Sequence, residues 1–467
     1  MELENLVIAP DDMALVDREA AASGISSLGL MERAGQAVAA AALRLFPEAL
    51  RFAVLCGPGN NGGDGYVAAR ALREAGADVA VHALGDTAAL RGDAAAMFAA
   101  FGGPVAALDG YTPQLGDVVV DALFGAGLAR GLPDEAVRTI EAVRALALPV
   151  LAVDLPSGVD GRTGQVRGAA FEAAACVTFM CRKPGHLLLP GRALSGTLEV
   201  FDIGIPARIV LQHSRHVRVN TPAVWRLALP AVNGDTHKYR RGHLAVFSGG
   251  ASGTGAARLS AAAGLRAGAG LVTVLSPREA LGTNAAHLTA VMLRPLDDEG
   301  DLEKLLDDER LATFVLGPGF GDAEKARAFT LLLARSGRRL VLDADGITAF
   351  RDRPGNLFSA FSAGSSRLVL TPHDGEFARL FPDLAENASL SKIERAQQAA
   401  ARSKGVMILK GADTVIAAPD GRALVNANAP PCLATAGSGD VLAGIVGAHL
   451  AQGMPAFEAA ASAVWRH

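Results

Sequence analysis

Short apolar, β-branched runs alternate with Ala-, Leu- and Arg-rich stretches of helical length through the first half of the chain. The runs are FAVLC (52–56), DVAVHAL (78–84), DVVVDAL (117–123), PVLAVDL (149–155), CVTFM (176–180) and TLEVFDI (197–203). Strands that alternate with helices of this length predict a parallel sheet covered on both faces. Ligands bind such sheets beyond the carboxyl ends of the strands. Polar residues gather there, at Asn60, Asn61, Asp121, Asp154 and Lys183.

This alternation stops between Ile209 and Val224 and then restarts. The later runs are HLAVFSGG (243–250), LVTVL (271–275), TFVLGPG (313–319), RLVLDAD (339–345), RLVLTPH (367–373), VMILKG (406–411) and TVIAAP (414–419). A chain of 467 residues is too long for one ordinary domain. We therefore predict two α/β domains, at residues 1–215 and 225–467, joined by a linker at 216–224.

Composition narrows the class of protein. The net charge of −4 and the pI near 6.2 argue against a nucleic-acid or anionic-membrane partner. The four cysteines form no Cys-x-x-Cys pair, so we expect reduced, mostly buried thiols. The first residues lack a basic-then-apolar signal, and the uncharged stretch 441–457 contains a His, a Gln and a Pro, as a buried helix would. These features predict a soluble cytoplasmic protein.

The segment CGPGNNGGDGYVAAR (56–70) has the pattern of a strand, a glycine turn and a helix start. Such a unit directs free backbone N–H groups at an anion. Phosphate binding does not explain Asn60, Asn61 and Asp64, whose oxygens suit alkali or alkaline-earth cations. Asp121 and Ser157 supply two more oxygens at neighbouring strand ends. The alternative is that these residues only form turns and helix caps.

Several motifs in residues 1–215 resemble the NAD(P)H-hydrate epimerase domain. They are LMERAGQAVA (30–39), GPGNNGGDGYVAAR (57–70), DALFGAGL (121–128), VDLPSGVD (153–160) and TFMCRKPG (178–185). That family interconverts the R and S forms of hydrated NAD(P)H, which carries water at C6 of the nicotinamide ring. The resemblance implies a Rossmann-like domain in which potassium is held by Asn61, Asp121 and Ser157. It implies a hydrate site made of Asn60, Asn61, Gly62, Gly63, Asp64, Gly125, Ala126, Gly127, Leu128, Ala129, Arg130, Gly131 and Asp154.

Asp154 and Lys183 are the candidates for acid–base work at C6, because epimerisation there needs a positioned proton donor or acceptor. The alternatives are a structural carboxylate at Asp154 and a solvated surface charge at Lys183.

A second glycine loop, ATAGSGDVLAG (434–444), precedes an apolar stretch. Backbone N–H groups of residues 436–439 would form an anion hole at the helix start. An acid at that place repels phosphate, so Asp440 suggests a base that takes the proton of an acceptor hydroxyl during phosphoryl transfer. The alternative is a capping Asp.

The second half resembles the ADP-dependent NAD(P)H-hydrate dehydratase, a ribokinase-like domain. The motifs are 237–274, GPGFG (317–321), DADG (343–346), TPHDGEFARL (371–380), LKGADTVI (409–416) and ATAGSGDVLAGI (434–445). The resemblance implies an ADP/AMP site at Lys410, Gly411, Ala412, Asp413, Thr414 and Gly439. It places the hydrate against Ala251, Gly319, His373 and Asp440. Asp440 would activate the C6 hydroxyl, ADP would phosphorylate it with Mg²⁺ bridging the phosphates, and loss of phosphate would restore NAD(P)H beside AMP.

Some of these residues have ordinary structural alternatives. His373 could be a hydrogen-bonded surface residue and Lys410 an exposed charge. Asp343 and Asp345 are explained equally well as turn residues or as indirect Mg²⁺ ligands, so we leave them outside the predicted site.

The sequence therefore predicts a bifunctional repair enzyme that acts on NAD(P)H hydrates and ADP, expected to form a symmetric homo-oligomer. One alternative is that the second domain is a small-alcohol kinase. Another is that the first domain binds a dinucleotide without catalysis. Relatives usually continue past the last apolar helix with a His-Gly pair, whereas this chain stops at His467. From that difference we expect lower stability with intact active-site motifs.

Overall fold

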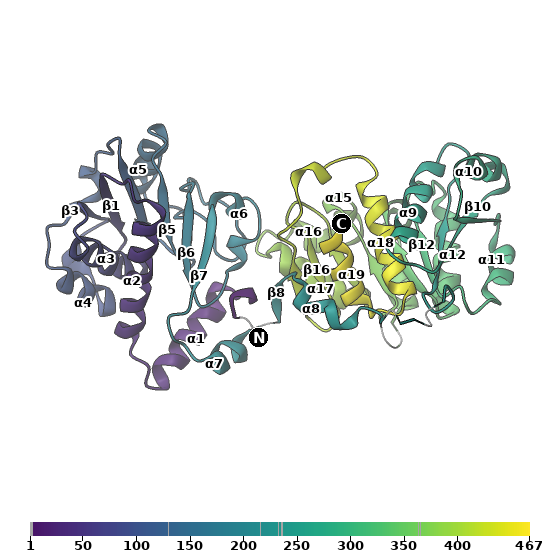
Figure 1. Ribbon diagram of the computed structural model, residues 1–467, viewed down its shortest axis with the longest axis horizontal. Helices are drawn as coiled ribbons and strands as arrows, with labels where there is room; N and C mark the ends of the chain where they lie inside the picture. The colour runs from purple at the N-terminus through teal and green to yellow at the C-terminus, as the bar shows by residue number, and fades with distance from the viewer. Residues whose placement is uncertain are drawn as a thin grey trace. The chain divides into compact units, whose positions relative to one another are not determined.

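The chain forms two compact units, Met1–Val217 and Arg218–His467, in the computed structural model (Figure 1). The structure describes residues 3–128, 130–214, 216–231, 233–234, 237–362, 364 and 366–467. Residues 216–224, which the sequence analysis assigned to a linker, contain strand β8 (Val217–Val219) and most of helix α8 (Pro222–Trp225).

The first unit contains a seven-stranded sheet in the order β3-β2-β1-β4-β5-β6-β7. All pairs in it are parallel. The strands are β1 (Arg51–Cys56), β2 (Val79–Ala83), β3 (Ala106–Ala107), β4 (Asp117–Ala122), β5 (Val150–Val153), β6 (Ala175–Phe179) and β7 (Thr197–Phe201). Each predicted run is a strand, and only the two-residue β3 was not expected. The chain leaves β1 toward β2 and returns on the other side as β4, so the strand order reverses between β1 and β4.

Helices cover both faces of this sheet, as the near-continuous apolar strands predict. Phe52, Val54 and Cys56 of β1 pack in one apolar cluster with α1 (Pro10–Ala22), α2 (Ser27–Leu45), α3 (Asn60–Glu74) and α4 (Gly92–Phe101). Ala53 and Leu55 face the other way, toward α5 (Asp134–Ala145). The three-layer, Rossmann-like architecture is therefore confirmed.

The second unit contains a ten-stranded sheet in the order β11-β10-β9-β12-β13-β14-β15-β16-β17-β8. The strands before β8 in this order are β9 (His243–Phe247), β10 (Leu271–Ser276), β11 (Met292–Pro295), β12 (Thr313–Leu316), β13 (Arg339–Leu342), β14 (Leu368–Leu370), β15 (Val406–Leu409), β16 (Val415–Ala417) and β17 (Ala423–Val425). The pairs from β11 to β15 are parallel, and the two pairs that join β15, β16 and β17 are antiparallel. Only residues 410–414 connect β15 to β16, which is too short for a parallel crossover. The sequence analysis did not expect β8, β11 or β17.

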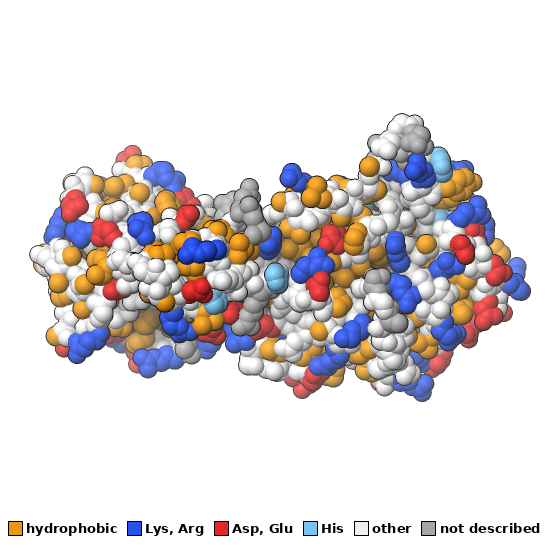
Figure 2. Space-filling view, turned by 90° about the horizontal axis from the view of Figure 1, so that it is seen from below, with side chains coloured by type: hydrophobic (Ala, Val, Ile, Leu, Met, Phe, Trp, Pro, Cys, Tyr) orange, Lys and Arg blue, Asp and Glu red, His pale blue; other side chains and the backbone are white. Residues whose placement is uncertain are grey.

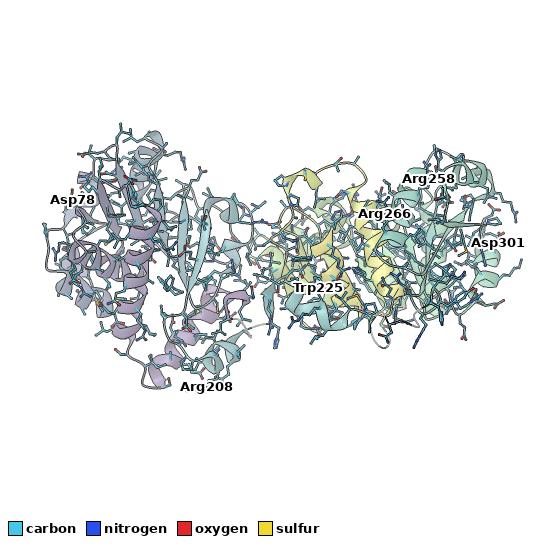
Figure 3. All side chains as sticks on the ribbon, viewed as in Figure 1. Asp78, Arg208, Trp225, Arg258, Arg266 and Asp301 are labelled. Atoms are coloured by element: carbon cyan, nitrogen blue, oxygen red, sulfur yellow. The ribbon has the colours of Figure 1, made fainter. Side chains whose placement is uncertain are left out.

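Apolar helices lie against this second sheet. Residues of α9 (Thr254–Arg266), α18 (Ser438–Ala451) and α19 (Ala456–Arg466) share one buried cluster with its strands. Residues 441–451 of the uncharged stretch lie in the largely buried α18, as predicted, whereas 452–455 form a turn that leads into α19. No helix within the described residues is long and apolar enough to cross a membrane. Trp225 of α8, labelled in Figure 3, packs on Trp465 of α19 with ring centroids 5.6 Å apart.

The remaining helices lie between successive strands along the chain. They are α6 (Gly191–Leu194), α7 (Ala207–His213), α10 (Leu281–His287), α11 (Glu299–Leu306), α12 (Ala323–Arg335), α13 (Ala344–Thr348), α14 (Pro354–Ala360), α15 (Asp374–Leu380), α16 (Pro382–Glu386) and α17 (Lys392–Ser403). Basic and acidic side chains are interspersed over the face shown in Figure 2.

Glycine is required where the loop after β1 meets the loop after β4. A β-carbon on Gly57 would overlap the carbonyl oxygen of Leu123, whereas one on Gly59 would have no atom within 4 Å. We therefore expect Gly57→Ala to lower the free energy of unfolding of the first unit by about 1–3 kcal/mol or more. Gly59→Ala, the matched control, should leave it nearly unchanged.

Hydrogen exchange of peptides from β1 and α3 would measure this difference. Both tryptophans, Trp225 and Trp465, lie in the second unit, so tryptophan fluorescence would verify that the second unit is undisturbed. Equal protection in both variants would show that the two loops can move apart at no cost.

Candidate active sites

The first unit has a cavity of about 700 Å³ where the strand order reverses. Doubly wound sheets bind their ligands at such a switch point. The expected site residues that line the cavity are Asn60, Asn61, Asp64, Gly125, Ala126, Gly127, Leu128, Arg130, Asp154 and Lys183. A stripe of α1 and residues of α2 complete the wall, including Asp17 and Met31.

Three residues of the expected hydrate site do not line this cavity, and a fourth lies outside the described residues. A β-carbon on Gly62 would overlap the carbonyl oxygen of Gly57, and one on Gly63 would meet Sδ of Met31 at 2.5 Å. These two glycines therefore allow α3 to pack closely on its neighbours. Gly131 is likewise not part of the wall, and Ala129 lies outside the described residues.

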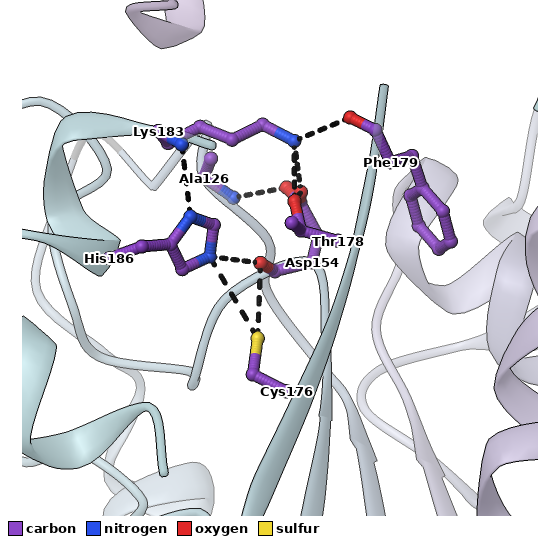
Figure 4. Close-up of polar contacts among 7 residues, drawn as sticks. All are labelled: Ala126, Asp154, Cys176, Thr178, Phe179, Lys183 and His186. Carbon is purple, nitrogen blue, oxygen red and sulfur yellow. Dashed lines mark hydrogen bonds and ion pairs between the residues drawn. The ribbon is translucent and has the colours of Figure 1, made fainter. Parts of the chain in front are cut away.

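Asp154 follows β5, and both of its carboxylate oxygens accept hydrogen bonds (Figure 4). Its Oδ1 accepts from Lys183 Nζ at 2.6 Å and from Thr178 Oγ1 at 2.9 Å, and its Oδ2 accepts from the Ala126 N–H at 2.9 Å. Burial works to raise the pKa of Asp154, but the charge and hydrogen bond of Lys183 outweigh it and lower that pKa to about 2. Asp154 is therefore ionised at any physiological pH.

Lys183 is buried, with a side chain 4% exposed, and not a surface charge. Its Nζ donates to Asp154 Oδ1, to Thr178 Oγ1 at 2.8 Å and to the Phe179 carbonyl at 3.3 Å. An ammonium group has three donors, and all three are used here.

His186 connects the main chains of these two residues, which the sequence analysis did not anticipate. Its Nδ1 accepts from the Lys183 N–H at 2.9 Å, so its Nε2 carries the proton and donates to the Asp154 carbonyl at 2.7 Å. Cys176 Sγ also donates to that carbonyl, at 3.3 Å. Asp154 has a φ of +66°, a left-handed conformation that costs a non-glycine residue of order 1 kcal/mol or more. His186 and Cys176 stabilise that conformation.

His186 should make the stability of the first unit depend on pH. Burial and the nearby Lys183 charge lower its pKa to about 4, below the 6.5 of an unfolded histidine. The unfolded state then binds one proton more than the folded state between these values. We expect the free energy of unfolding to fall by about 3 kcal/mol as the pH drops from 6.5 to 4, with no such loss above 6.5.

His186→Gln, which keeps one donor and one acceptor, should remove this slope. Hydrogen exchange of peptides from β5 and β6 at pH 7.0 and 4.5 would measure it. An unchanged slope in the variant would assign the effect to other groups, such as the half-exposed His82.

A second cluster of oxygens lies beside the cavity. Asp121, at the end of β4, is fully buried; its Oδ1 accepts from Ser157 Oγ at 2.6 Å and its Oδ2 from Ser157 N–H at 2.7 Å. Ser157 Oγ also lies 3.1 Å from the Phe124 carbonyl oxygen. Asn61 approaches the adjoining Gly125, and its buried Nδ2 has no hydrogen-bond partner. Burial raises the pKa of Asp121 to about 6.

These groups supply hard oxygen donors with a single carboxylate, which suits a monovalent cation better than a transition metal. Within the described part of the chain, no three His, Cys, Asp or Glu side chains are grouped as a metal site would require.

In the second unit, Lys410 lies between three carboxylates at the carboxyl ends of the strands. Its Nζ is 3.0 Å from Asp343 Oδ1 and 3.9 Å from Glu376 Oε2. A β-carbon on Gly439, in the first turn of α18, would lie 3.4 Å from the same nitrogen. Burial and the charge of Asp343 raise the pKa of Asp440, and Lys410 opposes them. Lys410, Gly439 and Asp440 are therefore neighbours in the structure.

Asp343 and Glu376 belong to this site although the sequence analysis did not include them. Asp343 is 1% exposed and also accepts from Thr371 Oγ1 at 2.7 Å. Both residues lie in motifs visible in the sequence, DADG and TPHDGE, but acidic residues after a strand are equally typical of a turn. The burial of Asp343 and its ion pair with Lys410 show that it is not merely a turn residue.

His373 caps its own helix. Its Nδ1 accepts from the Gly375 N–H at 3.0 Å, and its backbone N–H donates to Glu376 Oε2 at 2.9 Å. The imidazole is more than half exposed, so it can still reach a ligand. Glu376 connects it to Lys410.

The predicted nucleotide segment 410–414 forms a self-contained turn. Thr414 Oγ1 donates to the Gly411 carbonyl at 2.7 Å and accepts from its N–H at 3.2 Å. Asp413 pairs with Lys392 of α17 at 2.6 Å, a partner that no sequence motif indicated. Beside the α18 start, His467 Nε2 lies 3.2 Å from Ser438 Oγ, a contact that the sequence did not predict either.

Ala251 and Gly319 lie in loops that press together where the order of the second sheet reverses, between β9 and β12. A β-carbon on Gly249 would overlap the Gly319 carbonyl oxygen. The adjacent Gly250 and Phe320 line a cavity of about 360 Å³. Its polar wall is made of Glu279, Asp297, Asp322 and Lys325. The four predicted hydrate residues are thus spread along one sheet edge, with Ala251 and Gly319 at one place and Asp440 near Lys410.

The two units define a class of two-domain α/β proteins in which a Rossmann-like domain precedes a second α/β domain with a largely parallel sheet. A family model described as the YjeF-related protein N-terminus matches residues 27–185, and one described as NAD(P)H-hydrate dehydratase matches residues 244–467. The chain is 39% identical to a bifunctional NAD(P)H-hydrate repair enzyme of Thermofilum pendens, over 98% of this chain and 89% of that one. It therefore belongs to the family of bifunctional NAD(P)H-hydrate repair enzymes.

A second relative bears the same name. It is the repair enzyme from Moorella thermoacetica, which is 37% identical over 99% of this chain and 91% of that one. Among solved structures, an ADP/ATP-dependent NAD(P)H-hydrate dehydratase from Bacillus subtilis was co-crystallised with ATP and Mg²⁺. It is 24% identical with a TM-score of 0.45 over 53% of this chain and 86% of that one.

Proposed function

We propose that the first unit interconverts the R and S forms of NAD(P)H hydrate and that the second unit dehydrates the S form with ADP, giving NAD(P)H, AMP and phosphate. The observation that carries the proposal is the buried, ionised Asp154–Lys183 pair in the large cavity of the first unit. Ionisable groups with strongly shifted pKa values in a cavity are candidates for catalysis, and binding a dinucleotide does not by itself require such a pair.

In the first unit, we assign the dinucleotide to the cavity wall formed by the loops after β1 and β4. The free N–H groups at the start of α3 face the phosphates there. Asp154 is the charged group at C6, and Lys183 keeps it ionised. His186 and Cys176 fix the position of its backbone.

The oxygen cluster of Asn61, Asp121 and Ser157 fits a potassium ion, and the Phe124 carbonyl adds a fourth oxygen. Bound there, potassium would supply positive charge beside the phosphates. The assignment is supported by the grouping of these oxygens around one buried carboxylate, with Asn61 Oδ1 against the adjoining Gly125. Potassium titration of the apo protein, followed by hydrogen exchange of the loop after β4, would test binding apart from activity.

In the second unit, we assign Asp440 as the base that takes the proton of the C6 hydroxyl when the hydroxyl attacks the β-phosphate of ADP. N–H groups at the start of α18 and the Lys410 ammonium face the transferring phosphoryl group. Mg²⁺ bound with the nucleotide would neutralise phosphate charge. Residues 410–414 form the adenosine edge, and Ala251, Gly319 and His373 meet the hydrate.

Recovery of reduced-nicotinamide absorbance from a mixture of R and S hydrates tests the whole proposal, with purified protein, ADP, Mg²⁺ and K⁺. Complete recovery means that both units work as proposed. Recovery that stalls when the S form is spent removes the epimerase assignment and leaves the dehydratase. A small-alcohol kinase would instead prefer ATP and leave a stable phosphorylated product. No recovery with either nucleotide overturns the repair function.

We also propose a cytoplasmic, symmetric homo-oligomer without a nucleic-acid partner. The proposal is supported by the free thiols of all four cysteines, by the common symmetry of such enzymes and by the mild negative charge. Light scattering after size exclusion would measure the oligomeric state.

A further inference from the structure

Among the described residues, one buried carboxyl group that lines the cavity of the first unit has no hydrogen-bond partner. Asp64 of α3 lines the cavity, and its residue surface is 9% exposed. No hydrogen bond or ion pair joins its carboxyl oxygens to another residue in the part of the chain that the structure describes. A buried carboxylate without a partner is costly, so this group retains its proton.

Asp64 and Asp154 therefore face one cavity in opposite protonation states. Burial is the main cause that raises the pKa of Asp64 well above its usual value, and the negative charges of Asp154 and Asp17 add to it. Asp154, by contrast, is ionised beside Lys183. Two carboxyl groups whose surroundings separate their pKa values in this way have the properties of an acid and a base.

The other charged groups of the cavity do not remove the difference between the pKa of Asp64 and that of Asp154. Lys183 is the one cation that lowers the pKa of Asp64, and it is already paired with Asp154. The titratable and charged side chains that line the cavity with Asp64 are Asp17 of α1, Asp93 of α4, Arg130 after β4, Asp154 after β5 and Lys183 after β6. The residue surfaces of Asp17 and Arg130 are exposed, although partial burial of the Asp17 carboxyl raises its pKa as well.

Lys183 is not suited to donate a proton to the substrate, although it is the nearest acid to Asp154. Its three N–H donors point at Asp154 Oδ1, Thr178 Oγ1 and the Phe179 carbonyl. A donor for the C6 hydroxyl has to come from elsewhere in the cavity, and Asp64 is the buried group with a free proton.

We propose, on the basis of the epimerase activity assigned above, that Asp64 is the general acid of epimerisation and that Asp154 is the base on the opposite face of the ring. Asp64 donates its proton to the C6 hydroxyl, the C6–O bond breaks, and the oxygen leaves as water. The N1 lone pair forms an N1=C6 double bond, and the Asp154 carboxylate stabilises the cationic ring. A water molecule then adds to C6 from the other face and loses a proton to Asp154.

The step balances without a redox partner. One water leaves and one enters, and the two carboxyl groups exchange protonation states, which solvent in the cavity restores. Asp154 suffices as a base in spite of its low pKa. A water oxygen bonded to an iminium carbon is positively charged and more acidic than a carboxylic acid.

Asp64→Asn tests the proposal in the full-length protein, because the variant keeps the shape of the side chain but cannot transfer a proton. We expect the kcat of epimerisation to fall about 100-fold or more, with the KM for the R hydrate changed only a few-fold. Oxygen-18 from labelled water should enter the hydrate during wild-type epimerisation and not in the variant beyond the spontaneous rate. The fall in wild-type rate at high pH, caused by ionisation of Asp64, should disappear.

Two variants and one internal control accompany it. Asp64→Glu keeps the acid and should restore part of the rate. Asp109→Asn removes an exposed carboxyl group of the same unit that does not line the cavity, and it should change the rate less than twofold. The rate at which the second unit of each variant dehydrates pure S hydrate reports how much of the protein is folded. This rate should equal that of the wild type.

Two results would overturn the proposal in different ways. If Asp64→Asn epimerises at the wild-type rate, or loses affinity alone, Asp64 only binds the dinucleotide. If the wild-type protein dehydrates S hydrate but never converts R to S, the epimerase assignment itself fails, and the role of Asp64 fails with it.

Discussion

Asp440→Asn is expected to lower the kcat of ADP-dependent dehydration by about 10³-fold and to leave epimerisation unchanged. The carboxylate is placed beside Lys410 and Gly439, where it can accept the proton of the attacking hydroxyl. Asn has the same shape but no basicity, so the attacking hydroxyl keeps its proton and the phosphoryl group has no nucleophile. Reduced-nicotinamide absorbance from pure S hydrate with saturating ADP and Mg²⁺ gives the rate.

ADP affinity separates this role from a simple cap at the start of α18. Fluorescence titration with an ADP analogue should give the same Kd in Asp440→Asn and wild type, or a tighter one, because removal of a negative charge near the phosphates relieves repulsion. A variant that retains more than a tenth of the wild-type kcat would contradict the base assignment. It would leave Asp440 as a capping residue.

Asp154→Ala is expected to abolish epimerisation and also to destabilise the first unit. Its removal leaves the Lys183 ammonium buried, with hydrogen bonds only to Thr178 and Phe179. Loss of one partner of a buried ion pair costs about 3–5 kcal/mol. In the mixed-hydrate assay, recovery should stop when the S form is spent. Hydrogen exchange of β5 and β6 should show the destabilisation.

The double variant Asp154→Ala with Lys183→Met separates the two effects. It removes the stranded charge, so most of the stability should return while epimerisation stays absent. If the single variant is as stable as the wild type, the ion pair is more solvated than its burial indicates. If the single variant still epimerises, the first unit does not use Asp154 at all.

The sequence predicted the strands of both sheets well because each core strand is a run of apolar, β-branched residues with a turn signal after it. It missed β3, β8, β11 and β17, which have two to four residues each and lie at or near sheet edges. A run of two to four residues is too short to show a strand pattern, even where every residue is apolar and buried, as in β17. The direction of β16 follows from the length of its connection, which the sequence does contain.

The residues of the candidate sites also fall into two groups, those that the sequence predicted and those that it did not. Residues in glycine loops after strands were found, because strand order brings those loops together. His186, Glu376 and Lys392 were not found, since each acts on another side chain or on a backbone group far along the chain. Lys183 shows the limit most clearly: a lysine after a strand is usually exposed, and only the tertiary structure reveals that this one is 4% exposed.

The glycine contacts between loops have a consequence for how this family can diversify. The loops after β1 and β9 each lie directly against the backbone of the loop across the switch point, at Gly57 with Leu123 and at Gly249 with Gly319. A side chain on Gly57 or Gly249 would overlap the facing backbone, so we expect both positions to remain glycine. In an alignment of relatives, we expect the glycines next to the strands to be invariant and the loop residues further from the strands to vary. New substrate preferences would then arise by substitution of the outer loop residues, while the contacts between the glycines and the facing backbone stay the same.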